Sequence, residues 1–325
     1  MSQSSLGNPP RRRRSRFKKF FYRPEAWFVT AATLALRPLT IGGQLRMGAV
    51  LGRLAWLFSP RRAMSVENAR RALGVDETEA RRIARASHLH LGRSVVEFLT
   101  STSYLEPKRA GLLEPDNLEH IQKASDEGRG VILVTAHLGN WELGAIKQAL
   151  EGVPILALGR EPKNPYLARR LQANRKLCGN EWLPRNRTLL YAAKALKKGR
   201  CVAMAIDQHT RSEPRIKTEF LGRPAVLSTA VFELAVRLGC PVVPAVTFPK
   251  VGGGYRLVYH PPFHASETGD RDERVRELAG RCHRLAESWI RGAPDSWFWF
   301  HDLWKGVPLE TASNSPEPAP TALEA

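Results

Sequence analysis

The 325-residue sequence contains few cysteines and lacks the common metal and nucleotide motifs. Its four cysteines (Cys178, Cys201, Cys240 and Cys282) form no C-x-x-C pair and have no metal-ligand spacing, which favours reduced thiols in a cytosolic compartment. The motif H-E-x-x-H, a Walker loop and a dinucleotide fingerprint are also missing. We therefore expect no metal and no cofactor. A chain of this length buries about three quarters of its unfolded surface and folds without such staples.

The sequence also lacks an apolar run that could span a bilayer. The longest uncharged apolar stretch near the N-terminus, 26–36, has 11 residues and ends at Arg37, and the next run, 47–58, contains Arg53. A membrane-spanning helix needs about 20 apolar residues. Both segments are therefore predicted to lie in the membrane interface or to pack on the folded domain. No secretory signal is expected, because the run is short and no obvious small-residue cleavage site follows it.

Acidic residues are in the minority. The chain has 31 Asp and Glu against 50 Lys and Arg, a formal charge of +19. Eight of the basic residues lie within 11–23, interleaved with four aromatic residues. Basic residues attract anionic lipid headgroups and aromatic rings insert beside them, so this segment favours an anionic membrane surface as its partner. Nucleic-acid binding through phosphate contacts and an idle solvated tail are the alternatives.

We predict four regions: a basic disordered arm over 1–23, a helical, membrane-associated region over 24–110, an α/β domain over 111–308 and a disordered tail over 309–325. The run Val131–Thr135 is typical of a strand buried on both faces. Other strands are predicted at 154–158, 201–206, 241–248 and 255–259. Helices are predicted at 76–99, with Asp76 as the N-cap, and at 117–123, 141–150, 166–178, 189–198, 228–238 and 270–291. This alternation predicts an α/β fold with a mostly parallel central sheet flanked by helices, preceded by N-terminal interfacial helices.

The densest group of reactive residues follows the strand at 131–135 and opens the next helix. It reads His137-Leu-Gly-Asn-Trp-Glu142, with Gly139 supplying turn freedom and Asn140 a good N-cap. Ligand sites lie at the carboxyl ends of parallel strands. A neutral imidazole accepts a proton from a hydroxyl at pH 7, and a carboxylate on its other nitrogen stabilises the resulting imidazolium. Because no serine or cysteine adjoins the cluster, an acceptor hydroxyl is predicted to attack directly.

This cluster resembles the H-x4-D/E motif of the glycerolipid acyltransferase superfamily. Its H-x-G-N-W-E form is similar to that of the bacterial lipid A biosynthesis acyltransferase family, the lauroyl and myristoyl transferases. Further segments resemble the family in the same order, and the resemblance covers about residues 25 to 308. They are Arg160–Asn164, Arg175, Ala205–Gln208, Phe220–Ala225, Pro241–Pro244 and Trp299–Lys305.

The resemblance implies a glycerolipid acyltransferase-like fold and transfer of a fatty acyl chain from acyl carrier protein to a hydroxyl of a membrane glycolipid, foremost a lipid A precursor. It makes His137 the general base and Glu142 its orienter. Arg160 and Arg175 suit an anionic headgroup or phosphopantetheine, with a solvated face as the alternative. Asp207 is expected to bind one of these arginines or to cap the next segment. The expected substrate-binding residues are Asn140, Arg160, Asn164, Arg175, Asp207, Gln208 and Arg223.

The implied location is the cytoplasmic face of the inner membrane, as a peripheral protein. Its expected partners are acyl carrier protein, a membrane glycolipid and the anionic membrane surface, with no nucleic acid. The sequence departs from the family at one point: the family ends its last block with H-R-R-W-K, whereas this chain has His301-Asp302-Leu303-Trp304-Lys305. Two cationic side chains are missing, so a phospholipid, an ornithine lipid or an inositol mannoside is the alternative acceptor.

Overall fold

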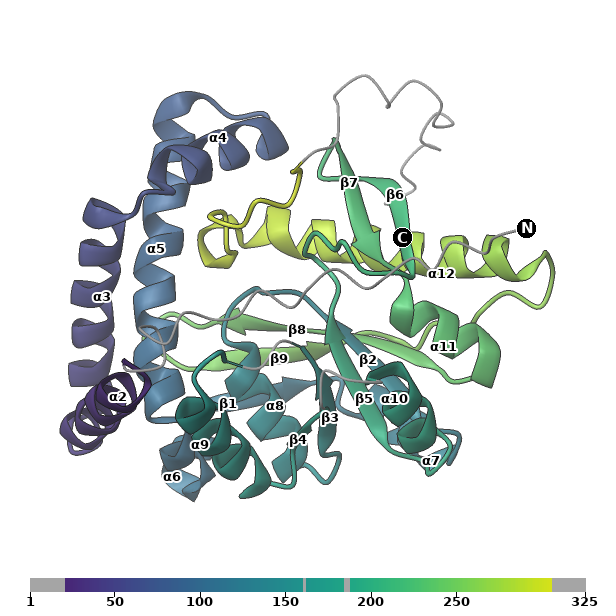
Figure 1. Ribbon diagram of the computed structural model, residues 1–325, viewed down its shortest axis with the longest axis horizontal. Coiled ribbons are helices and arrows are strands. Elements are labelled where there is room, and N and C mark those ends of the chain that lie inside the picture. The colour runs from purple at the N-terminus through teal and green to yellow at the C-terminus, as the bar shows by residue number, and fades with distance from the viewer. Residues whose placement is uncertain (1–20, 160–161, 184–187, 306–325) are drawn as a thin grey trace, which may run out of the picture.

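A computed structural model describes residues 21–159, 162–183 and 188–305. Most of the predicted arm, the whole predicted tail and Arg160 lie outside these residues. Figure 1 shows a sheet between layers of helices, with the long helix α5 (Glu77–Leu99) and the helices around it along one side. Asp76 caps α5, as predicted, and its side chain accepts a hydrogen bond of 2.8 Å from the backbone N–H of Glu79.

The described residues form a seven-stranded sheet of order β1-β9-β8-β2-β5-β3-β4, and a separate hairpin of β6 and β7. Strands β8, β2, β5, β3 and β4 run parallel, whereas β9 and β1 run in the opposite direction. The predicted mostly parallel sheet is therefore confirmed. The strands are β1 (Leu113–Asp116), β2 (Val131–Thr135), β3 (Ile155–Leu158), β4 (Glu181–Trp182), β5 (Cys201–Ala205), β6 (Arg215–Phe220), β7 (Arg223–Ser228), β8 (Val242–Pro249) and β9 (Tyr255–Tyr259).

The helices alternate with these strands along the second half of the chain, as the sequence predicts. Besides α5, they are α2 (Tyr22–Leu36), α3 (Ile41–Phe58), α4 (Arg62–Leu73), α6 (Pro107–Ala110), α7 (Glu119–Asp126), α8 (Trp141–Leu150), α9 (Pro165–Lys176), α10 (Thr188–Leu196), α11 (Ala230–Leu238) and α12 (Arg271–Gly292), with 3-10 turns at Ser101–Leu105 and Pro294–Ser296.

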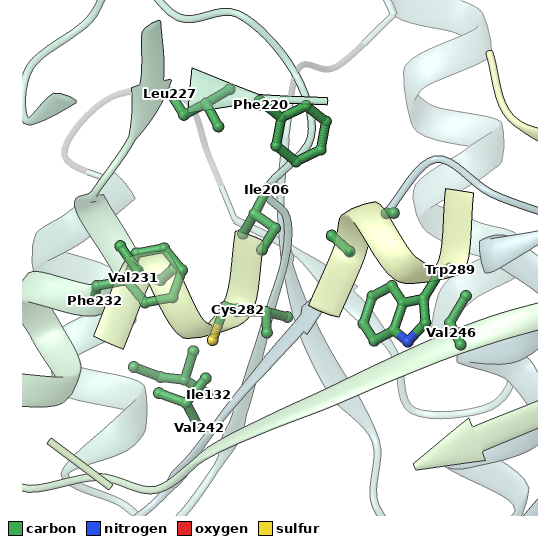
Figure 2. Packing of buried hydrophobic residues seen from close by; sticks show 14 of the residues in the cluster. Ile132, Ile206, Phe220, Leu227, Val231, Phe232, Val242, Val246, Cys282 and Trp289 are labelled. Atoms are coloured by element: carbon green, nitrogen blue, oxygen red, sulfur yellow. The ribbon is translucent and has the colours of Figure 1, made fainter. Parts of the chain in front are cut away.

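Strand β2 is buried on both faces, as its β-branched run predicts. On one face Ile132 packs with residues of α11 and α12 in the larger core, and Figure 2 shows it beside Val242 and Cys282. On the other face Leu133 belongs to a second core. Alternate residues of a strand point to opposite faces, so a continuous apolar run serves a sheet that is covered on both sides.

The N-terminal helices α2 and α3 contain the two apolar runs of the sequence. Helix α3 lies against α5 at very short range, because glycines face each other: a Cβ atom on Gly92 would lie 2.2 Å from the carbonyl oxygen of Gly48. Within the described residues, no helix combines the length and the apolar character needed to cross a membrane.

For the segment 220–225 the sequence favours a loop along the acyl path, with a plain turn as the alternative. The turn is what forms: the segment makes the tip of the β6–β7 hairpin, with Leu221 and Gly222 at φ of 54° and 71°. Two consecutive residues with positive φ are what a tight two-residue hairpin turn requires. Strands β1 and β4 were not predicted, because four and two residues are too few to show a periodic pattern.

Candidate active site

The cluster that begins at His137 forms a sharp elbow between β2 and α8. Gly139 has a φ of 62°, and a Cβ atom there would lie 1.8 Å from the carbonyl oxygen of Thr247, so only glycine fits. Asn140 is the N-cap of α8, as predicted, and its side chain accepts a hydrogen bond of 3.3 Å from the backbone N–H of Leu143. The elbow thus fixes His137 at the carboxyl end of the central strand.

The imidazole of His137 pairs with Asp207, which follows β5. The distance from Nδ1 to Oδ1 is 2.8 Å, and the His137 backbone N–H donates to Oδ2 at 2.7 Å. The indole N–H of Trp297 also donates to Oδ2, at 2.7 Å. Burial opposes the charged form of Asp207, but the interactions with His137 and Trp297 outweigh it, so the pKa of this carboxyl lies below its ordinary value. Since Nδ1 is occupied, Nε2 is the nitrogen left for chemistry.

The carboxylate on His137 is therefore that of Asp207 and not, as predicted, that of Glu142. Glu142 instead pairs with Arg175 of α9, whose Nε donates to Oε2 at 3.1 Å. Arg175 also lies over the ring of Trp182, 4.0 Å from its centroid. The physical reason is that Glu142 is already in the first turn of α8, where the helix directs it toward α9. The strand order places Asp207 beside His137, because β5 is the neighbour of β2.

The other predicted substrate-binding residues separate into two groups. Arg175 and Gln208 line the cavity that contains His137. Asn164 instead caps α9 and donates to the carbonyl of Tyr22 at 2.8 Å, so it ties α9 to α2. Arg223 lies over the ring of Trp304, 4.2 Å from its centroid, and it is not among the cavity-lining residues. Asp207, which was expected either to bind one of these arginines or to cap the next segment, pairs with His137 instead.

A cavity of about 940 Å³ opens beside His137. Trp141 and Phe298 contact the imidazole at ring-centroid distances of 4.8 and 6.2 Å. Its lining is mixed, with polar side chains such as Gln148, Gln208 and His301 beside apolar ones. Leu133, Ile155, Ala203, Ala245 and Leu257 are among the apolar wall residues. The site thus combines a paired histidine with a large, partly apolar cavity.

Trp297 and Phe298 belong to this site, although their role could not be predicted from the sequence. By sequence, the nearby aromatic residues Trp297, Trp299, Phe300 and Trp304 are compatible with an interfacial belt, an acyl wall or core packing. The structure buries Trp297 and Trp299 in the core and sets Phe298 beside His137. No cluster of three or more His, Cys, Asp or Glu side chains with the geometry of a metal site occurs in the part of the chain that the structure describes.

The sequence as a whole matches the family described as bacterial lipid A biosynthesis acyltransferase, over residues 14–306. The chain belongs to this family. It is 29% identical to the lipid A biosynthesis lauroyltransferase of Escherichia coli K12 over 269 residues, covering 81% of this chain and 85% of that protein. It is 25% identical to the lipid A biosynthesis palmitoleoyltransferase of the same strain over 225 residues, with 69% and 71% of the two chains covered.

A third relative has a different name. The chain is 24% identical to a phosphatidylinositol mannoside acyltransferase of Mycolicibacterium smegmatis over 199 residues, covering 56% of this chain and 64% of that protein. All three relatives are acyltransferases by name, and they differ in the lipid that the name gives. Family membership therefore supports lipid acyl transfer and leaves the acceptor to be determined.

The departure from the family near the C-terminus has a clear structural basis. Leu303 is fully buried in the larger core, and Asp302 forms an ion pair of 3.3 Å with Lys305. Trp304 packs under Arg223, and its indole N–H donates to the carbonyl of Phe220 at 3.1 Å. In this family member, the block after His301 therefore serves the core and an exposed ion pair.

Proposed function

We propose that this protein transfers a fatty acyl chain from an acyl carrier protein thioester to a hydroxyl of a membrane glycolipid, foremost a lipid A precursor. The observation that supports it most is the His137 imidazole, held by buried Asp207 beside a large cavity with apolar walls. A hydroxyl needs a base, and a fatty chain needs an apolar space. One site provides both.

In the proposed reaction, Nε2 of His137 accepts the proton of the acceptor hydroxyl while the oxygen attacks the thioester carbonyl carbon. Asp207 fixes the imidazole tautomer and stabilises the imidazolium that forms. The carbon–sulfur bond then breaks, and the departing carrier thiolate takes the proton from His137. Backbone amides at the start of α8, or the guanidinium of Arg175, stabilise the developing oxyanion.

The apolar part of the cavity is the proposed site of the acyl chain. The wall that the sheet contributes extends from Thr135 to Ile155. Ile155 lies level with Val131, because both residues pair with Cys201 of β5. Four residues of strand span about 13 Å. An extended chain of staggered C–C bonds advances about 1.3 Å per carbon, so this depth accepts about ten methylene groups. Ala203, which has a small side chain, pairs with Leu133 and so lies midway along this wall.

Ala203→Leu is expected to shift the enzyme toward shorter acyl chains, because the larger side chain fills the middle of the cavity. The measurement is a competition among carriers loaded with chains of ten to eighteen carbons, with the products separated by mass. Ala193→Leu is the matched control, since Ala193 is equally buried but does not line the cavity. Overpacking costs either variant about 1–3 kcal/mol of stability, and only Ala203→Leu should change the chain preference. An unchanged preference would place the chain elsewhere.

Peripheral binding to the anionic membrane surface, from the cytoplasmic side, is also proposed. Helices α2 and α3 expose large apolar side chains that a soluble face would not need, among them Trp27 and Phe28 at 75% and Phe58 at 79%. Arg37, Arg46 and Arg53 lie on or beside the same helices. Exposed apolar rings next to cations are suited to the headgroup region of an anionic bilayer.

The double variant Trp27→Ser/Phe28→Ser should therefore bind anionic vesicles at least about tenfold more weakly, since burying each ring contributes about 1.5–3 kcal/mol. Co-sedimentation with vesicles containing phosphatidylglycerol measures this. Val251→Ser is the control, because Val251 is a fully exposed apolar residue between β8 and β9. Equal binding of the double variant and the wild type would refute the assignment of this face.

The proposed function is tested by incubating the purified protein with loaded acyl carrier protein and a lipid extract, and searching by mass for lipids that gain one acyl group. A gain on a lipid A precursor is expected. The phosphatidylinositol mannoside acyltransferase relative favours one second candidate, an inositol mannoside acceptor, so this lipid is assayed in parallel. No gain with any acceptor, from either an acyl carrier protein or a coenzyme A donor, would refute acyl transfer.

A further inference from the structure

One face of helix α5 carries a buried polar stripe. Ser87, His90, Ser94 and Glu97 follow one another at spacings of three and four residues, which places them on one side of the helix. Their exposed fractions are 0%, 7%, 8% and 3%. A helix face packed against a domain normally carries apolar residues. This stripe is polar, and it faces the elbow that presents His137.

Three members of the stripe contact the elbow or the segment beside it. Glu97 Oε2 accepts hydrogen bonds from the Asn140 side chain at 2.9 Å and from the Tyr255 hydroxyl at 2.5 Å. The His90 imidazole hydrogen-bonds the backbone of Gly139. Ser87 donates to the carbonyl of Trp297, the residue whose indole contacts Asp207, at 2.5 Å.

Glu97 is the member of this stripe whose burial is least favourable. Burial raises the pKa of its carboxyl above the ordinary value, although the hydrogen bonds from Tyr255 and Asn140 oppose the rise. A buried carboxyl is unfavourable unless it is fully hydrogen-bonded, and an apolar side chain would fill the same space without that cost. What a leucine could not do is fix the side chain of Asn140, the cap on which the first turn of α8 depends.

We propose that Glu97 is a positioning residue for acyl transfer: through Asn140 it fixes the start of α8, and thereby the direction of the His137 elbow and of the amides that face the reacting carbonyl. This inference rests on the acyl transfer proposed above. Glu97 itself touches no substrate, because it does not line the cavity. Its effect should therefore appear in kcat and leave the KM for donor and acceptor unchanged.

Three variants test this role. Glu97→Leu leaves the Asn140 amide without its acceptor and should lower kcat about 30-fold. Glu97→Gln should stay within about threefold of wild type, because its oxygen still accepts from Asn140 and its amide can donate to Tyr255. Asn140→Ser keeps an N-cap oxygen but removes the contact with Glu97, so it should resemble Glu97→Leu. The double variant Glu97→Leu/Asn140→Ser should be no slower than either single one, since both break the same link.

The control is Glu287→Leu on α12. Glu287 is also partly buried, with a pKa that burial raises, and it accepts a 2.9 Å hydrogen bond from the backbone N–H of Leu221, away from the elbow. Its loss should lower the melting temperature and leave kcat unchanged. All variants are compared at a temperature where circular dichroism shows them folded. If Glu97→Leu does not fold, the positioning role is tested by comparing the kcat of Glu97→Gln with that of Asn140→Ser.

The failure of this inference is distinct from failure of the proposed function. Acyl transfer that survives His137→Ala overturns the proposed function. If His137→Ala is inactive, the positioning role is overturned by any of three results: full kcat in Glu97→Leu, additive losses in the double variant, or full kcat in Asn140→Ser. Coupled losses in kcat with unchanged KM establish it.

Discussion

His137→Ala is expected to reduce the rate of acyl transfer by about 10²–10⁴-fold, the usual contribution of a positioned general base. The imidazole is the group whose free nitrogen faces the cavity once Asp207 occupies Nδ1. The fold should survive, because the elbow depends on Gly139 and on the Asn140 cap more than on the His137 ring. Initial rates with loaded acyl carrier protein, at saturating acceptor, measure the loss.

The control for this experiment is His264→Ala, which removes an exposed imidazole that lies outside the cavity. It should retain the wild-type rate. A His137→Ala protein that is folded and turns over normally would mean that another group accepts the hydroxyl proton, and the mechanism would have to be abandoned.

Asp207→Asn is expected to cost a similar factor, about 10²–10⁴-fold, by disturbing the tautomer of His137. Asp207 accepts three N–H groups: the ring and the backbone of His137, and the indole of Trp297. An amide has one oxygen and one NH2, so at least one donor would then face another donor. Stopped-time assays across pH, with donor and acceptor both saturating, measure the effect on kcat.

The same substitution should also lower stability in a pH-dependent way. The pKa of Asp207 is lower in the folded state than in the unfolded chain. Its charged carboxyl therefore stabilises the fold fully when the pH is above the unfolded-state pKa, and this contribution is lost as the pH falls through the folded-state pKa. The difference in unfolding free energy between wild type and Asp207→Asn should therefore be largest near neutral pH and narrow in acid. Urea titrations at neutral and acidic pH measure it.

Glu142→Gln is the comparison that separates the two carboxylates. Glu142 contacts Arg175 and not His137. Replacing its carboxylate by an amide should therefore slow the reaction by displacing Arg175, without changing how kcat falls on the acid side of its pH profile. Asp207→Asn should change this acid-side fall of kcat, since it alters the partner of the imidazolium. The opposite result, an altered acid-side fall in Glu142→Gln alone, would restore Glu142 as the orienter of His137.

Local sequence patterns were sufficient for most of the fold. The runs at 131–135 and 255–259 predicted β2 and β9 with their observed ends, and the N-cap signals at Asp76 and Asn140 predicted the starts of α5 and α8. These features depend on neighbouring residues, through β-branched packing and through caps that bond the backbone two or three residues on. The β6–β7 hairpin was not predicted, although β6 alternates charged residues with Ile216, Thr218 and Phe220, the pattern of a half-buried strand.

The sequence by itself determined that His137, at the end of a buried strand, is the candidate base, and that the chain carries the ordered motifs of a lipid acyltransferase family. Only the tertiary structure decided which carboxylate contacts the His137 imidazole. Asp207 is 70 residues away along the chain, and it meets His137 because β5 pairs with β2. The contact of Glu97 with Asn140 likewise joins residues 43 apart. Such pairs depend on strand order and helix packing, which no local pattern contains.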